Sequence, residues 1–183
     1  MPASDDLIIL SRRTESFLGS SFEWCHVRGG IVTLLDASHY EGTKGGTYHV
    51  DDFAIAKYSI TNSQYKKFLD HPNGFSNLKW WEFSPQANQW RKDHQNPKPT
   101  AFEGTDLPRT RVSWFDSVAF CNWLSAELTV DIRLPAEQEW QRAAIGDTGG
   151  SYPWGYELDE TRVNYANRVG RSVERRVGKE CRS

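Results

Sequence analysis

The stretch VSWFDSVAFCNWLSAEL, residues 112–128, has the strongest helical pattern in the chain. Ser113 is suited to cap the helix, and Asp116 lies three residues later, where the positive end of the helix dipole favours a carboxylate. Helical spacing puts a set of mostly apolar residues on one face: Trp114, Val118, Cys121 and Leu124 or Ser125. The pattern therefore predicts a helix that packs one face against a core.

A second helix is predicted over RLPAEQEWQRAA, residues 133–144. Pro135 suits a first helical turn because it has no N–H to lose there. Glu137 and Glu139 favour the same end of the helix dipole. The glycines and turn residues of GGSYPWGYELDE follow and end the helix.

The earlier part of the chain contains one more helix signal and two strand signals. TNSQYKKFLD (61–70) has Thr61 and Gln64 in capping-box spacing, which predicts a helix start. DDFAIAKYSI (51–60) alternates like a half-buried strand. HVRGGIVTLLDA (26–37) reads as a Gly-Gly turn followed by a strand.

Two further stretches are predicted to be loops. GTKGGTYHV (42–50) is rich in glycine but lacks the spacing of a phosphate loop. Residues 71–108 are weakly periodic, and only LKWWEFSPQANQW (78–90) is expected to be locally ordered. Short strands, a few helices and long loops together predict an irregular α+β fold.

Composition limits the class of protein. The chain has 183 residues, 38% hydrophobic and 25% charged, which fits one globular domain. The net charge is −2, without a basic stripe, so nucleic acid is not an expected partner. No apolar run is long enough to span a membrane, and the start lacks the order of a signal peptide. Three widely spaced cysteines, Cys25, Cys121 and Cys181, agree with a cytoplasmic protein.

The eight tryptophans are a high number for this length. Most of them are expected to fill an irregular core, with their indole N–H groups paired to the backbone. A surface that stacks on carbohydrate is the functional alternative.

Four motifs in order carry a family resemblance: YSITNSQYKKFL (58–69), RVSWFDSVAFCNWLS (111–125), RLPAEQEWQRAA and YPWGYELD (152–159). Together they resemble the formylglycine-generating enzyme, or sulfatase-modifying factor, family. The resemblance runs from about residue 27 to 167. It implies an irregular α+β domain related to the C-type lectin fold and dense in aromatic residues.

The resemblance implies several functions. The founding activity oxidises a cysteine of a sulfatase peptide to formylglycine with O₂ and a copper ion held by two cysteines. Relatives include a non-haem-iron enzyme that joins sulfur to a histidine betaine. Others are non-catalytic modules that present binding surfaces.

The chain departs from the family pattern at its end. Family members continue after YPWG through a GNVWEW-like motif to a region holding the copper cysteines, and neither is found here. We therefore predict a lead-in at 1–20, an incomplete family domain at 21–170 and a non-native tail at 171–183. The tail carries five Arg/Lys and two Glu, and a native flexible basic tail is the alternative.

The metal-site prediction rests on one segment. Asn167 and the carbonyl of Arg168 resemble the family segment that helps bind a structural calcium, with Asn164 a possible substitute ligand. Calcium needs about six to eight oxygens, so the other ligands would come from the missing half. Copper or iron is expected only in a full-length form, because the five histidines lack ligand spacing and the iron relatives use a separate histidine-rich domain.

No catalytic or cofactor-binding residue is predicted within the chain. Cys121 and Cys25 are expected to be buried, and Cys181 lies in the predicted tail. Asp116, Arg133, Glu137 and Glu139 are read as helix-capping and scaffold residues rather than an acid/base cluster. Relatives have Thr or Ser where this chain has Ala136, so the capping hydroxyl is lost.

Two functions remain open. The full-length protein could be a metal- and O₂-dependent oxidase acting on a cysteine-containing peptide or small thiol, with this fragment inactive. Alternatively, it is a non-catalytic module that binds a ligand or protein. Half of a single-core domain would leave the Trp114 and Trp140 helices uncovered, which predicts marginal stability and self-association.

Overall fold

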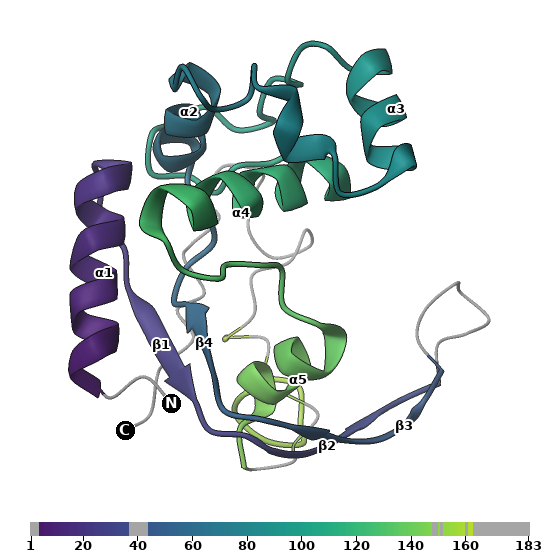
Figure 1. Ribbon diagram of the computed structural model, residues 1–183. Helices are drawn as coiled ribbons and strands as arrows, with labels where there is room; N and C mark the ends of the chain where they lie inside the picture. The colour runs from purple at the N-terminus through teal and green to yellow at the C-terminus, as the bar shows by residue number, and fades with distance from the viewer. Residues whose placement is uncertain (1–3, 37–43, 148–149, 151, 160, 163–183) are drawn as a thin grey trace. The chain divides into compact units, whose positions relative to one another are not determined.

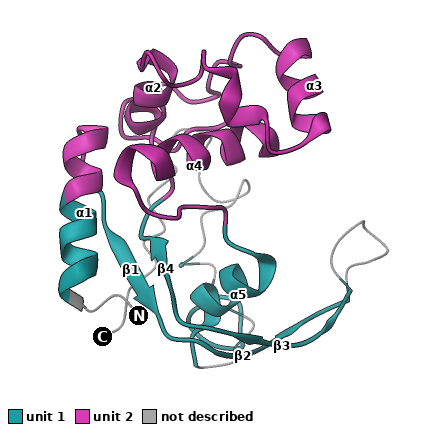
Figure 2. Cartoon of the chain, viewed as in Figure 1, with its two compact units in different colours: residues 1–12, 22–58, 135–183 teal, residues 13–21, 59–134 magenta. Residues whose placement is uncertain are grey.

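The computed structural model describes residues 4–36, 44–147, 150, 152–159 and 161–162 (Figure 1). It divides into two compact units, one of residues 1–12, 22–58 and 135–183 and the other of residues 13–21 and 59–134 (Figure 2). Helices and small antiparallel sheets confirm the mixed α+β prediction. None of the described helices combines the length and apolar character needed to cross a bilayer.

The first unit contains two short antiparallel sheets. Strand β1 (Trp24–Val27) pairs with β4 (Phe53–Ala56), and β2 (Gly30–Leu34) pairs with β3 (Gly46–Val50). Two chain segments thus run side by side through both sheets, and the ladder breaks between them at 28–29 and 51–52 (Figure 1). Val32 and Leu34 are buried, and helix α5 (Glu137–Ile145) packs against β2 and β3.

Two sequence predictions are corrected here. The Gly-Gly pair makes no turn but lies at the break between β1 and β2, and residues 46–50 form β3 rather than a loop. The break requires Gly29 for steric reasons, because a Cβ there would lie 2.4 Å from the Val50 carbonyl oxygen. The glycine content of this segment favours a loop, but pairing with β2 makes residues 46–50 a strand.

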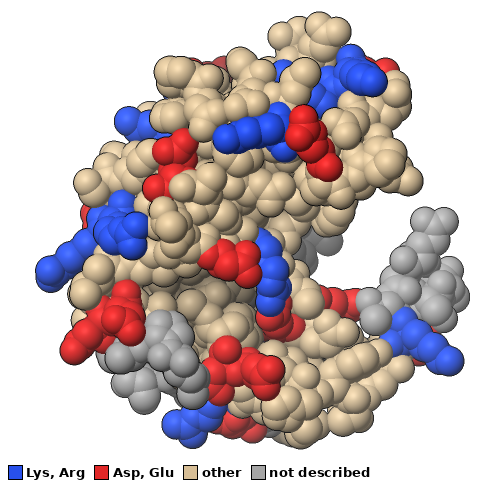
Figure 3. All heavy atoms as spheres, in the orientation of Figure 1, with Lys and Arg blue, Asp and Glu red and all other residues tan. Residues whose placement is uncertain are grey.

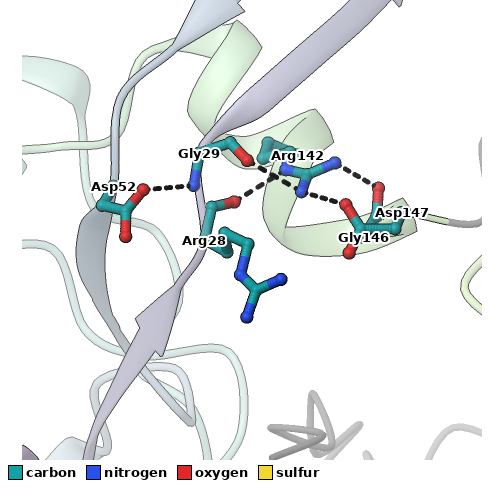
Figure 4. Close-up of polar contacts among 6 residues, drawn as sticks. All are labelled: Arg28, Gly29, Asp52, Arg142, Gly146 and Asp147. Atoms are coloured by element: carbon teal, nitrogen blue, oxygen red, sulfur yellow. Dashed lines mark hydrogen bonds and ion pairs between the residues drawn. The ribbon is translucent and has the colours of Figure 1, made fainter.

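Arg142 of α5 fills the hydrogen-bonding gap at this break (Figure 4). Its guanidinium donates to the carbonyls of Arg28 at 2.8 Å and Gly29 at 2.9 Å. It also donates to the Gly146 carbonyl at 2.7 Å and to the Asp147 carboxylate. The Arg142 side chain is only 5% exposed, so a buried cation donates to three partly buried backbone carbonyls.

Asp52 satisfies the remaining group at the break (Figure 4). Its Oδ1 accepts the Gly29 N–H at 2.9 Å, and its Oδ2 lies 3.0 Å from His26 Nε2. The hydrogen bond from the Gly29 N–H, followed by the contact with His26, lowers the pKa of Asp52. Asp52, from the paired segment, and Arg142, from α5, thus take the place of the missing ladder hydrogen bonds.

The second unit is built around an aromatic core. The Phe68 ring of helix α2 (Asn62–Asp70) has no exposed surface and lies within about 6 Å, centroid to centroid, of five other rings. These rings are Tyr65, Phe75, Trp81, Phe120 and Trp123. They come from α2, the 3₁₀ helix η2 (Leu78–Trp81), helix α4 (Trp114–Leu128) and the loop at residue 75, so one side chain joins most of the unit.

The predicted helix starts are confirmed. Thr61 and Gln64 form the capping box of α2, and the Ser113 hydroxyl accepts the Asp116 N–H of α4 at 3.1 Å. Residues 78–90 are ordered as η2 and the start of helix α3 (Pro85–Asp93). Helix α5 starts at Glu137 with Ala136 as its N-cap, and Glu139 accepts the Ala136 N–H at 2.7 Å without a capping hydroxyl in return. Pro135 lies before this cap, so the prediction that it belongs to the first helical turn is wrong.

Two expectations about helices are revised. No element is predicted over residues 1–20, yet helix α1 spans Ser4–Leu18 and buries Leu7, Thr14 and Leu18. Trp114 was expected to face the core but is 61% exposed. In the first turn of α4 it stacks edge-on against Phe83 and Phe115, while Phe120, Trp123 and Leu124 face the core.

We predict that Arg142→Met lowers the free energy of unfolding by about 1–3 kcal/mol, because it removes the donor to three partly buried carbonyls. Urea unfolding followed by circular dichroism measures the change. Asp147→Asn is the matched control and should have a small effect, because Asp147 is 77% exposed. Equal effects of the two variants would contradict the anchoring role.

We predict that Ala136→Ser raises the free energy of unfolding by about 1 kcal/mol, because the hydroxyl completes the capping box with Glu139. Thermal unfolding measures this gain. Ala136→Val, which adds volume without an acceptor, should give no gain. If Val stabilised the chain as much as Ser, capping would not be the cause.

Candidate functional site

The described cysteines are not arranged for chemistry. Cys121 is a free thiol on a buried face of α4, and burial raises its pKa to about 11. Cys25 of β1 is buried and held in a disulfide. The expected burial of both is confirmed, and neither offers a thiolate at neutral pH. These two residues therefore do not fit a copper ion held by two cysteines.

The described histidines each have a local partner. His26 pairs with Asp52, His49 lies 3.6 Å from Asp51, and His71 lies 3.9 Å from Glu127. The His94 ring stacks on Trp90 with centroids 3.7 Å apart. Within the described residues, no group of three His, Cys, Asp or Glu side chains could hold a metal ion. The predicted calcium residues, Asn167 and Arg168, lie outside the described residues, as do Asn164 and Cys181.

The carboxylates considered as an acid/base cluster have structural partners. Asp116 accepts the Ser113 hydroxyl at 2.7 Å and the Trp81 indole N–H at 3.4 Å. Glu139 accepts the Ala136 N–H, and the Arg133 guanidinium donates to the Leu134 carbonyl at 3.1 Å. The scaffold interpretation of Asp116, Arg133 and Glu139 agrees with these contacts.

The second unit contains an open cavity of about 440 Å³ near the start of α4. Its lining combines an aromatic wall, an aliphatic residue, two cations, a hydroxyl and a carboxylate: Trp90, Val112, Lys98, Arg111, Ser113 and Asp116. Small-molecule sites commonly have volumes of roughly 300–1,000 Å³ and a few polar groups on an apolar lining. The cavity is therefore a candidate binding site within the described residues.

An aromatic row lies beside the cavity. The Trp90 and Phe115 rings are 5.4 Å apart, Phe115 and Trp114 are also 5.4 Å apart, and Trp114 lies 5.8 Å from Phe83. Trp114 and Phe83 are exposed. The row continues the apolar wall of the cavity to the surface.

The backbone around the cavity is held by specific contacts. Thr110 accepts the Ala101 N–H at 2.8 Å and lies 3.0 Å from the Thr100 hydroxyl. The backbone N–H of Arg109 donates to the Ile60 carbonyl at 2.8 Å, and the Arg109 guanidinium donates to the Lys98 carbonyl. Arg111 then adopts a left-handed conformation with φ of 56°, which is uncommon for a residue with a side chain.

Sequence reasoning did not identify the cavity. Lys98 lies in a stretch whose sequence predicts a loop, and Arg111 lies two residues before the predicted cap at Ser113. Only the contacts between residues 98–101 and 109–110 bring them to one cavity. Acidic and basic side chains are interspersed on the face shown in Figure 3, so the distribution of charge on that face does not indicate where the cavity lies.

Comparison with known proteins establishes the family. Residues 19–181 match the family described as the sulfatase-modifying factor enzyme 1-like domain. This chain belongs to that family, as the four motifs indicated.

Named relatives include both active and inactive proteins. The chain is similar to the inactive C-alpha-formylglycine-generating enzyme 2 of Mus musculus, with 38% identity over 63% of the chain and 44% of the relative. It is similar to the formylglycine-generating enzyme of Thermomonospora curvata, with 38% identity over 61% of the chain and 44% of the relative. The hercynine oxygenase of Mycobacterium tuberculosis is 31% identical over 68% of the chain and 32% of its own length. The aligned part thus spans less than half of each relative.

Proposed function

We propose that this chain supplies scaffold and a ligand-binding cavity to a formylglycine-generating-enzyme-like protein. In its full-length form that protein would be a metal- and O₂-dependent oxidase acting on a protein cysteine or other thiol. The observation that carries the proposal is the state of the described cysteines: Cys121 is a buried thiol with a raised pKa, and Cys25 is in a disulfide. Oxidation chemistry would therefore need residues other than these two.

The metals of the full-length form are part of the proposal. Copper or iron would supply the activation of O₂, and a structural calcium would include Asn167 and the Arg168 carbonyl among its oxygen ligands. We propose that the protein acts on a cysteine-containing peptide or a small thiol. The disulfide of Cys25 does not favour the cytoplasm expected from the cysteine pattern, because cytoplasmic thiols are kept reduced. Trp140, which is 54% exposed, and Trp114 offer apolar surface for self-association.

A second candidate function is a non-catalytic binding module on the same fold. The open cavity and the exposed aromatic row beside it support this alternative, since neither depends on a reactive thiol. The likeness to a relative named as inactive supports it as well. Both candidates use the cavity, and they differ in whether oxidation chemistry is added elsewhere.

We predict that this chain forms no formylglycine when it is incubated in air with copper and a cysteine-containing peptide. Mass spectrometry of the peptide measures the conversion, and the Thermomonospora curvata enzyme named above serves as the positive control. Copper-dependent turnover by this chain would contradict the proposal, because the described cysteines could not account for it.

A further inference from the structure

The cavity carries a surplus of positive charge. Lys98 and Arg111 contribute two cations against the single carboxylate of Asp116. Both basic residues are exposed, and within the described part of the chain neither side chain is engaged in a hydrogen bond or ion pair. Such free cations next to an apolar wall can receive an anion without first giving up a protein partner.

The Asp116 carboxylate does not pair with Lys98 or Arg111, because both of its oxygens accept hydrogen bonds from other side chains. The Ser113 hydroxyl donates to one oxygen at 2.7 Å, and the Trp81 indole donates to the other at 3.4 Å. Its position in the first turn of α4 also places it at the positive end of the helix dipole. The groups left to meet a ligand are therefore the two cations, Val112 and the part of Trp90 that His94 does not cover.

Arg111 has an unfavourable backbone conformation. A left-handed backbone disfavours a side chain, and glycine would adopt the same φ without strain. The residue nevertheless presents a guanidinium at the cavity. Strain at a residue that also lines a cavity is a common property of binding sites.

We propose that this cavity binds a small organic anion, a carboxylate attached to a planar apolar body. The carboxylate would lie between Lys98 and Arg111, where the guanidinium can donate two hydrogen bonds to it, and the planar body would pack against Val112 and the part of Trp90 that His94 does not cover. This assignment of ligand class rests on the proposed binding function of the same cavity. It is independent of whether the full-length protein oxidises a thiol.

Three matched probes test the ligand class: indole-3-acetate, its neutral amide indole-3-acetamide, and the cation tryptamine. Binding to the full chain is measured by NMR shift changes of backbone amides. We expect indole-3-acetate to shift the amides of residues 111–113 and to bind at least tenfold more tightly than the other two probes. Raising the salt concentration should weaken its binding, since the contact is charged.

Arg111→Gly is the decisive variant. It should weaken indole-3-acetate binding about tenfold while its Tm stays equal or rises, because glycine relieves the left-handed strain. Lys92→Ala removes an exposed lysine of α3 that does not line the cavity, and it should leave binding unchanged.

The outcomes separate the two levels of the proposal. Equal binding of all three probes, or unchanged binding in Arg111→Gly, would overturn the anion assignment while keeping the cavity as a binding site. If none of the probes shifts any cavity residue, the anion assignment fails and the proposed binding function loses its support. Preferential binding of tryptamine would show that Asp116, rather than the cations, selects the ligand.

Discussion

The first unit depends on one buried cation. The two sheets are separated by a break at which neither segment can continue the ladder, and an unsatisfied carbonyl in a buried position costs about 1–3 kcal/mol. The Arg142 guanidinium, on α5, donates hydrogen bonds to the carbonyls of Arg28 and Gly29. It also donates to the Gly146 carbonyl at the end of its own helix. The requirement links three features: glycines at the break, a helix beside β2 and a guanidinium on that helix. A lysine could not reproduce this arrangement, because it lacks the planar fork.

The second unit is organised differently, by rings and caps. Phe68 joins the aromatic core, while the caps at Thr61 and Ser113 fix where α2 and α4 begin. Because Ser113 both caps α4 and lines the cavity, the start of that helix also fixes the position of Arg111 two residues earlier. The cap of α4 and the lining of the cavity therefore share residues 111–116. The buried Cys121 lies further along the same helix, where its thiol serves packing.

The helix starts could be predicted from the sequence because they depend on contacts between near neighbours in the chain. Thr61 with Gln64 and Ser113 with Asp116 are contacts within one helical turn, so spacing alone identified both helix starts. Strand β3 could not be found that way, because residues 46–50 become a strand only by pairing with β2. The exposure of Trp114, the role of Arg142 and the cavity were missed for the same reason. Each depends on residues far apart in the chain.

Within the described residues, Cys121 is buried and Cys25 is held in a disulfide, so neither supplies a reactive thiol. The most direct test is the pH dependence of Cys121 alkylation by iodoacetamide, read by mass spectrometry, with the chain in concentrated urea as the reference. Burial predicts a thiolate only as pH approaches the raised pKa of about 11, against about 8.5 in urea. Rapid alkylation of the folded chain with a midpoint below pH 8 would contradict the account, because Cys121 would then be available for metal or redox chemistry.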